Sequence, residues 1–172
     1  MIEIRHLHDG NDVWGQMEGL AKVLVDCVEG GASVNFMANF SLDDASLFFE
    51  GVADAVDRGE RLAFAALEGE EVLGTVQVIL RMPPNQQHRG EIAKLLVRRS
   101  ARGQGVAQKL MAAAEAAALA AGKTILTLDT ASEAAERLYE RMGWTRVGSI
   151  PDFSLLPDGK PCASTFFWKA LG

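Results

Sequence analysis

The 172-residue sequence predicts an α/β fold with seven strands. Short apolar or alternating runs, typical of strands, are interspersed with segments whose apolar residues recur with helical period. The nearly continuous apolar run over 92–97 indicates a strand covered on both faces. These patterns give the order β-α-α-β-β-β-α-β-α-β-β, and the length is suited to one domain spanning residues 1–172.

The first half of the chain contains five strand or helix signals. The patterns predict strands over 2–7, 61–67 and 72–80, and helices over 12–29 and from 41 to about 58. Gly30-Gly31 ends the first helix, and Ser41-Leu42-Asp43-Asp44 resembles a capping sequence for the second. Segment 32–40 between them is an apolar, irregular loop. The turn Glu68-Gly69-Glu70 joins two of the strands.

The second half continues the alternation. The patterns predict strands over 89–98, 124–128, 144–149 and 163–169, and helices over 104–121 and 132–142. The first of these helices is rich in alanine, which favours helix formation and allows close packing on a sheet. Gly122 is the expected stop of that helix. Pro83-Pro84-Asn85 and Pro157-Asp158-Gly159 mark turns.

A glycine-rich turn links the strand that ends at Val97 to the alanine-rich helix. Gly103 and Gly105 allow close approach of a ligand and unusual backbone angles. The helix directs its free N–H groups and the positive end of its dipole at the turn, and Arg102 adds a permanent cation. This arrangement predicts a pyrophosphate site. It is neither a Walker A loop, which needs Gly-Lys-Ser/Thr, nor a Rossmann turn, because position 108 is Gln108.

The motif Arg102-x-x-Gly105-x-Ala107 resembles the acetyl-coenzyme A loop of the GNAT superfamily of N-acetyltransferases. It follows the strand Lys94-Leu95-Leu96-Val97 and precedes Tyr139-Glu140-Arg141-Met142-Gly143-Trp144, which is similar to the family's Tyr-x-x-x-Gly-aromatic signature. The resemblance implies the acyl-CoA N-acyltransferase fold, a mixed central sheet of about seven strands with helices on both faces. Blocks such as Gly31-Ala32-Ser33-Val34 and Leu128-Asp129-Thr130 further resemble the tabtoxin resistance proteins, which acetylate a small β-lactam toxin.

The resemblance implies acetyl-CoA as co-substrate and assigns residues to it. The strand before the turn splays from its neighbour and offers backbone groups to the cofactor; these are expected from Leu95, Leu96 and Val97. The pyrophosphate is expected on Arg102, Gly103, Gln104, Gly105, Val106 and Ala107. Many relatives carry an Asn after the next strand that contacts the coenzyme, whereas this chain has Thr130-Ala131-Ser132, so Ser132 is the candidate substitute.

Three residues are candidates for proton transfer. In the family pattern Tyr139 donates a proton to the coenzyme A sulfur; without that context it would be interpreted as a core aromatic residue. Glu91, at the start of the strand before the turn, and Asp129, at the end of the following strand, are the candidate bases or ligands of a substrate ammonium. Alternatively, Asp129 caps the following helix and Glu91 is a solvated strand end.

The apolar loop after the first helix is the candidate acceptor pocket. Ser33 and Asn35 are expected to orient a substrate, and Phe36 with Met37 to form its wall, although both are equally compatible with the core. Ser33 has no His partner of the kind that a nucleophilic triad needs. Arg89 and His88 are candidates for contact with a substrate carboxylate, or belong to a solvated loop.

Composition limits the possible partners. The chain is 48% hydrophobic and 23% charged, with no apolar run long enough for a membrane span and no signal segment, so we expect a cytoplasmic protein without a membrane partner. The net charge of −6 argues against nucleic acid. Cys27, Cys162 and the histidines lack metal-ligand spacing, so no metal is expected.

The expected reaction is direct transfer of acetyl from acetyl-CoA to the amine or hydroxyl of a small amino-acid-like molecule in a ternary complex. One alternative is a protein or peptide N-acetyltransferase, which needs an open groove around 31–40. The other is a non-catalytic acyl-CoA-binding module, which has no need of acid or base groups. A homodimer is the candidate assembly, because dimers are common in the superfamily.

Overall fold

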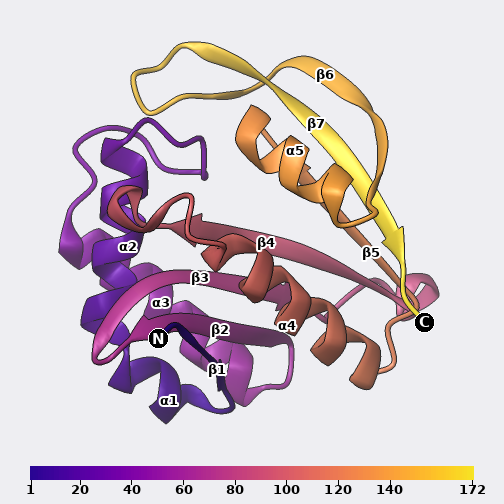
Figure 1. Cartoon of the computed structure of the whole chain (residues 1–172), viewed down its shortest axis with the longest axis horizontal. Coiled ribbons are helices and arrows are strands. Elements are labelled where there is room, and N and C mark those ends of the chain that lie inside the picture. The colour runs from indigo at the N-terminus through magenta and orange to yellow at the C-terminus, as the bar shows by residue number, and fades with distance from the viewer.

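The computed structural model describes residues 1–172 and contains a seven-stranded mixed sheet in the order β1-β2-β3-β4-β5-β7-β6 (Figure 1). The strands are β1 Glu3–Leu7, β2 Arg61–Glu68, β3 Glu71–Ile79, β4 Arg89–Val97, β5 Ile125–Thr130, β6 Thr145–Leu155 and β7 Pro161–Ala170. The α-helices are α1 Gly10–Gly15, α2 Met17–Glu29, α3 Leu42–Asp57, α4 Val106–Ala120 and α5 Glu133–Arg141. Short 3₁₀ turns η1 and η2 occupy Pro84–Gln86 and Arg99–Ala101. The predicted fold and strand number are confirmed.

Helices cover both faces of the sheet, as predicted (Figure 1). On one face, α1, α2 and α3 bury a core that includes Leu24 and Phe49. On the other, α4 and α5 bury a second core that includes Leu110, Met111 and Phe167. Each core removes a large apolar area from water, which is the main driving force for this layered arrangement. No helix is both long and apolar enough to span a bilayer.

The sheet opens in its middle. β4 and β5 form the only parallel pair, and their pairing is confined to Arg89–Glu91 opposite Ile125–Thr127. β3 stays paired with β4 as far as Val97, whereas β5 pairs with β7 on its other side through Thr130. The remainder of β4 therefore has no strand beside it on the β5 side, and the two strands splay apart (Figure 1).

A β-bulge lies in the splayed part of β4. Gln77 is opposite Ala93 and Thr75 is opposite Leu96, so one residue of β3 faces both Lys94 and Leu95. Lys94 has a φ of +52°, which is uncommon for a residue with a side chain. The bulge redirects the Lys94 side chain relative to a regular strand.

Most of the predicted helix boundaries are confirmed, and one is shifted. Ser41 and Asp44 form a reciprocal capping box at the start of α3, and Gly122 follows α4 with a φ of +84°. The helix predicted from Gln104 begins two residues later, because Gly105 is a left-handed N-cap. The helix predicted over 132–142 is present as α5, with Ser132 as its N-cap.

Three predicted elements differ from the structure in extent. The helix predicted over 12–29 is divided into α1 and α2 at Gln16, whose φ of −107° and ψ of 5° depart from helical values. The last two strands are longer than predicted, with β6 reaching Leu155 and β7 beginning at Pro161. β6 is an exposed edge strand, so its far end carries no alternation of buried and exposed residues from which a strand could be recognised.

Candidate active site

The turn between β4 and α4 presents a row of unpaired backbone donors. Gly103 and Gly105 both have a φ of +77°, which glycine adopts at low cost, and no side chain caps α4. The N–H groups of residues 103–108 have no acceptor within the protein, and the first one in the helix that is bonded is that of Lys109, to Gly105 O at 3.1 Å. Six consecutive donors at the positive end of a helix are suited to bind phosphate oxygens.

One cation of this turn remains available. Arg98 is paired with Glu71, and Arg99 pairs with Asp26 at 2.9 Å. Arg102 is exposed and forms no ion pair; its Nε donates to Val97 O at 3.3 Å. Its guanidinium is therefore free to meet an anion beside the unpaired N–H groups.

Burial raises the pKa of the Cys27 thiol, which lies behind this turn and contacts Val97 O at 3.5 Å. The neighbouring charge of Arg102 opposes this effect without reversing it. Cys27 is therefore a protonated, buried residue rather than an activated nucleophile.

The unpaired edge of β4 lies directly before the turn. Arg98 N donates to Leu73 O at 2.9 Å, so the backbone groups of Arg98 point toward β3. In an antiparallel pair, successive residues of a strand direct their backbone groups to opposite sides. The backbone groups of Val97 and Leu95 therefore point away from β3, toward the splay. Leu96 is opposite Thr75, and its carbonyl oxygen approaches Gly74 so closely that a Cβ there would lie 2.7 Å away. Leu95 and Val97 are thus the residues of this strand whose backbone donors face the opening.

Tyr139, the only tyrosine in the chain, lies on α5 and is 4% exposed. Its ring packs against Trp144 and Phe167, with centroids 5.9 Å and 5.6 Å away. Burial, with a smaller contribution from the charge of Asp129, raises the pKa of Tyr139 well above its ordinary value. The phenol is therefore protonated at neutral pH, which is the state required of a proton donor.

Glu91 and Asp129 lie on the same face of β4 and β5. Glu91 is opposite Thr127, two residues before Asp129, so the two carboxylates flank the point at which the strands separate. Glu91 is 3.5 Å from Arg89 Nη1, and Asp129 accepts a hydrogen bond of 3.1 Å from Ser164. Both side chains remain accessible to a ligand.

The alternative role of Asp129 as a helix cap is wrong. Ser132 is the N-cap of α5, and its Oγ accepts a hydrogen bond of 3.3 Å from Ala135 N. Thr130 Oγ1 in turn accepts from Ser132 N at 3.1 Å. A cofactor contact of Ser132, which stays a prediction, would use the hydroxyl proton, because the oxygen already caps the helix.

The predicted acceptor loop closes onto the β6–β7 hairpin. Ser33 Oγ donates to Leu155 O at 2.9 Å and lies 3.2 Å from Ser154 Oγ. Ala38 N donates to Pro157 O at 2.9 Å. These contacts join residues about 120 positions apart in the chain and fix the loop against the hairpin.

Aromatic contacts connect this loop to the face of the sheet. The Phe36 ring lies 4.3 Å from that of Phe40 and 5.4 Å from that of Phe48 on α3. The Lys94 ammonium lies 5.7 Å from the Phe48 ring centroid. Asn35 has a φ of +77°, which Asn tolerates better than most residues. Phe36 is thus partly buried against the core, and its contribution to an acceptor pocket stays a prediction.

Sequence reasoning missed a polar cluster on the same face. Arg61 Nη1 donates to Gln77 Oε1, and Gln77 is completely buried with no acceptor for its Nε2. Desolvation lowers the pKa of both Arg61 and Lys94, and Arg61 lowers that of Lys94 further. The signals for this cluster in the sequence are Gln77 and Lys94, each of which interrupts a run of apolar residues.

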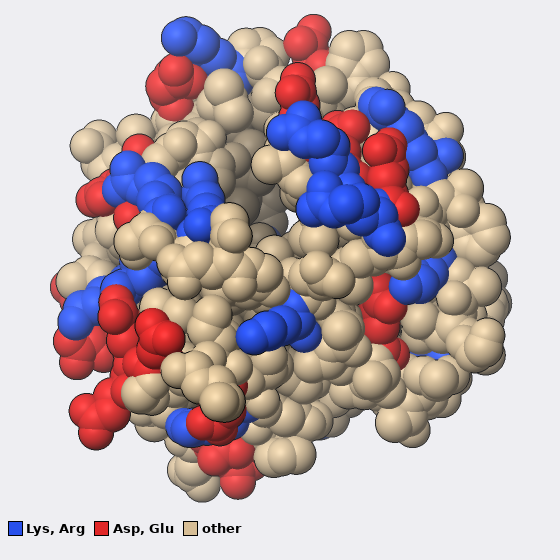
Figure 2. Space-filling model, viewed as in Figure 1, with Lys and Arg blue, Asp and Glu red and all other residues tan.

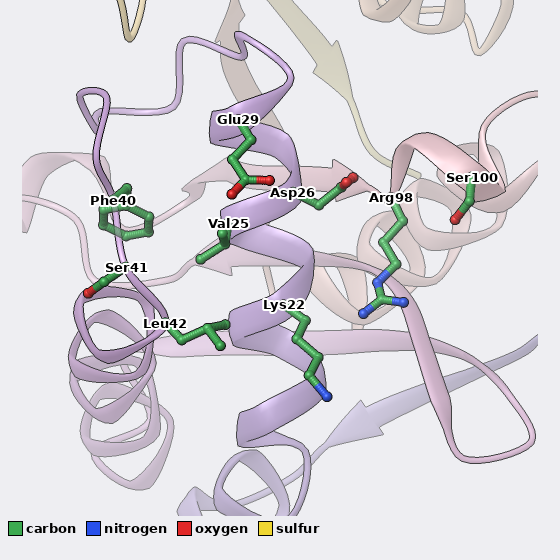
Figure 3. Close-up of a pocket in the computed structure, with 9 residues that line it drawn as sticks. All are labelled: Lys22, Val25, Asp26, Glu29, Phe40, Ser41, Leu42, Arg98 and Ser100. Carbon is green, nitrogen blue, oxygen red and sulfur yellow. The ribbon is translucent and has the colours of Figure 1, made fainter.

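The surface is hollowed between α5 and the turn after β4, and basic side chains lie on both sides of the hollow (Figure 2). A separate concavity of about 560 Å³ lies on the other side of this turn, along α2. Figure 3 shows Phe40 and Leu42 on one side of that helix and Arg98 with Ser100 on the other. The free N–H row, Tyr139 and both candidate bases border the splay rather than the α2 concavity, so the splay is the candidate active site.

The splayed sheet, glycine turn and uncapped helix define a site for an acyl carrier with a pyrophosphate. Residues 33–144 match the model of the acetyltransferase (GNAT) family, and the chain belongs to this family. It is also 43% identical over 60 residues to an acetyltransferase of Agrobacterium fabrum. That match covers 35% of this chain and 44% of the relative.

Solved structures share the fold across nearly the whole chain. The structure of yncA from Salmonella typhimurium with its cofactor acetyl-CoA has a TM-score of 0.78 at 19% identity, covering 100% of this chain and 95% of that one. A ribosomal-protein-alanine N-acetyltransferase from Brucella melitensis has a TM-score of 0.77 at 22% identity, covering 98% and 99%. A structure assigned as a phosphinothricin N-acetyltransferase has a TM-score of 0.78 at 16% identity, covering 100% and 99%. At these identities the likeness concerns the fold.

Proposed function

We propose that the protein transfers acetyl from acetyl-CoA to an amine or hydroxyl of a small amino-acid-like molecule, as in detoxification of a toxin or antibiotic. The observation that carries the proposal is the convergence of a phosphate-binding turn, a protonated tyrosine and two carboxylates on one opening in the sheet. A pure acyl-CoA-binding module would need only the first. The resemblance to the tabtoxin resistance proteins supports a small acceptor.

The residues divide the chemistry between them. The N–H groups of residues 103–108 and Arg102 hold the pyrophosphate, and a backbone N–H of Leu95 or Val97 donates to the thioester oxygen as negative charge develops there. The acceptor attacks the carbonyl carbon, the C–S bond breaks, and Tyr139 gives its proton to the departing sulfur. Glu91 or Asp129 takes the proton of the acceptor, directly or through water.

Closure of the acceptor loop favours a small molecule over a protein substrate. Its bonds to the hairpin, from Ser33 to Leu155 and from Ala38 to Pro157, fix the loop against the hairpin, whereas a peptide substrate would need an open groove along 31–40. Acetylation of a peptide library, with no reaction of small amines, would support the alternative of a peptide N-acetyltransferase.

The test is release of free thiol from acetyl-CoA by the purified protein. The acceptors are amino acids, tabtoxinine-β-lactam, phosphinothricin, polyamines, aminoglycosides and short peptides, and the matched variant is Glu91→Gln, Asp129→Asn. We expect turnover of a small acceptor that the variant loses, with acetyl-CoA still bound. A stable acetyl-enzyme would contradict direct transfer, and binding without turnover of any acceptor would favour the non-catalytic module.

A homodimer stays a prediction. The exposed edge strand β6 carries apolar side chains, among them Val147 at 70% and Phe153 at 49% exposure. Light scattering of the protein and of Phe153→Ser tests whether this strand contributes to an assembly.

A further inference from the structure

We propose that the acceptor carries a carboxylate or similar oxyanion beside its reacting amine, and that Lys94 and Arg61 bind this anionic group. The inference rests on the proposed function, since it assumes that the acceptor lies on the α3 face of β2–β5. It narrows the substrate class from amino-acid-like molecules in general to zwitterions with a free acidic group.

Lys94 is an ammonium group without a partner. It lies on the bulge of β4, half-buried above the Phe48 ring, and has no hydrogen bond or ion pair within the protein. Glu91 and Asp129 are close enough to influence its charge but do not pair with it. A lysine ammonium has three donors, so a partly desolvated one without acceptors is suited to bind an anion from outside the protein.

Arg61 adds a guanidinium near Lys94, and Gln77 orients it. A guanidinium contains only donors, so its bond from Arg61 Nη1 fixes the oxygen of the Gln77 amide toward Arg61. The amide Nε2 is then left fully buried without an acceptor. Gln77 therefore orients the Arg61 guanidinium from within the sheet, and the anion contacts Arg61 and Lys94 rather than the buried amide.

The arrangement of charges matches a zwitterion. Arg61 and Lys94 are like charges near each other on the β2–β4 side, and an anion between them relieves their repulsion. Glu91 and Asp129 flank the β4–β5 separation, where an ammonium would be attracted and, once deprotonated, would face the thioester. Polyamines and aminoglycosides lack the anionic group, and a peptide N-terminus has no free carboxylate next to its amine.

The experiment compares each amino acid that reacts with its carboxamide, which keeps size and amine but loses the negative charge. The proteins are the wild type, Lys94→Gln, the charge-preserving Lys94→Arg, and Arg5→Gln as a control at the far edge of the sheet. For the wild type we expect kcat/KM to be at least about 10-fold higher for the acid than for the amide. Lys94→Gln should lose most of this preference through a higher KM for the acid, whereas Lys94→Arg and Arg5→Gln retain it.

Equal use of acid and amide by the wild type would overturn the inference, as would an equal loss on both in Lys94→Gln. Reaction only with acceptors that lack an acidic group would overturn it while leaving the proposed function intact. If no acceptor releases thiol, the proposed function fails. Calorimetry then measures whether N-acetyl amino acids or their amides bind in the presence of coenzyme A. Preferential binding of the acids, lost in Lys94→Gln, would support the anionic site, and no binding would overturn it.

Discussion

The turn of residues 98–108 and the α3 face of β2–β5 serve the two substrates of one proposed reaction, yet they are built from different chemical groups. The turn offers backbone N–H groups, and only Arg102 adds a free charged side chain. The sheet face offers side chains, among them Lys94, Arg61 and Asp129. Many sequences can form the first surface if glycine permits the backbone, whereas single substitutions alter the second. We call the turn the cofactor half of the site, and the sheet face with the loop over 31–40 its acceptor half. The difference explains how the same cofactor half can be combined with many different acceptor halves.

Tyr139→Phe tests the group that lies between these two halves, and it carries the largest expected effect. The substitution removes the proton donor but retains the ring contacts with Trp144 and Phe167. We expect kcat to fall by about 100-fold or more, with acetyl-CoA affinity unchanged. Stopped-flow detection of thiol release and calorimetry measure the two quantities. An unchanged kcat would remove Tyr139 from the mechanism and leave it a core residue.

Arg102→Ala tests the cofactor half alone. Loss of a charge-assisted contact to the pyrophosphate, worth about 1.5–3 kcal/mol, should weaken acetyl-CoA binding by about 10-fold or more. The KM of the acceptor should stay unchanged, because Arg102 lies outside the sheet face. Calorimetry with acetyl-CoA provides the measurement, and Arg5→Ala on β1 is the matched control. Equal affinity in Arg102→Ala and wild type would remove the pyrophosphate assignment.

Alkaline pH tests the burial of Tyr139 without any ligand. Because its folded pKa is raised above the unfolded value of about 10, its contribution to stability is complete below pH 10 and is lost as the pH rises further. The free energy of unfolding should fall by up to about 1.4 kcal/mol per pH unit from this group. Urea titrations at several pH values would reveal this loss in the wild type and its absence in Tyr139→Phe. Identical slopes for both proteins would mean that the phenol is not desolvated.

Ser33→Ala tests the closure of the acceptor half and has the smallest expected effect. Its hydroxyl joins the acceptor loop to Leu155 O, and a hydrogen bond of this kind contributes about 1 kcal/mol. The acceptor KM should rise several-fold while the KM of acetyl-CoA stays constant. Ser46→Ala on α3 makes the same chemical change without a hydrogen bond to lose. A rise in the KM of acetyl-CoA instead would contradict the separation of the two halves.

Features set by local backbone chemistry could be predicted from the sequence. Gly103, Gly105 and Gly122 all adopt the positive φ that their positions suggested, and Ser41 forms the expected capping box. The element order and the strand number followed from hydrophobic periodicity. The family motif correctly indicated a splayed strand before the turn.

Features set by tertiary contacts could not be predicted. The bulge at Lys94 depends on the register between β3 and β4, and the pairing of Arg61 with Gln77 joins residues on different strands. The full length of β6 depends on its partner β7, because an exposed edge strand has no buried face to leave a periodic pattern. The break at Gln16 interrupts a helical pattern whose apolar spacing continues on both sides.

The short parallel pairing of β4 with β5 also has a mechanical consequence. Within the sheet, three residue pairs connect the half-sheet β1–β4 to the half-sheet β5–β7-β6. Outside it, the links include Glu115 of α4 to Trp144 and Lys169, and the bonds of the acceptor loop to the β6–β7 hairpin. Separation of the two half-sheets breaks far fewer hydrogen bonds than unfolding either one. The amides along the β4–β5 boundary should therefore exchange with solvent before those of β2 and β3. A ligand that contacts both half-sheets would hold them together and slow this exchange.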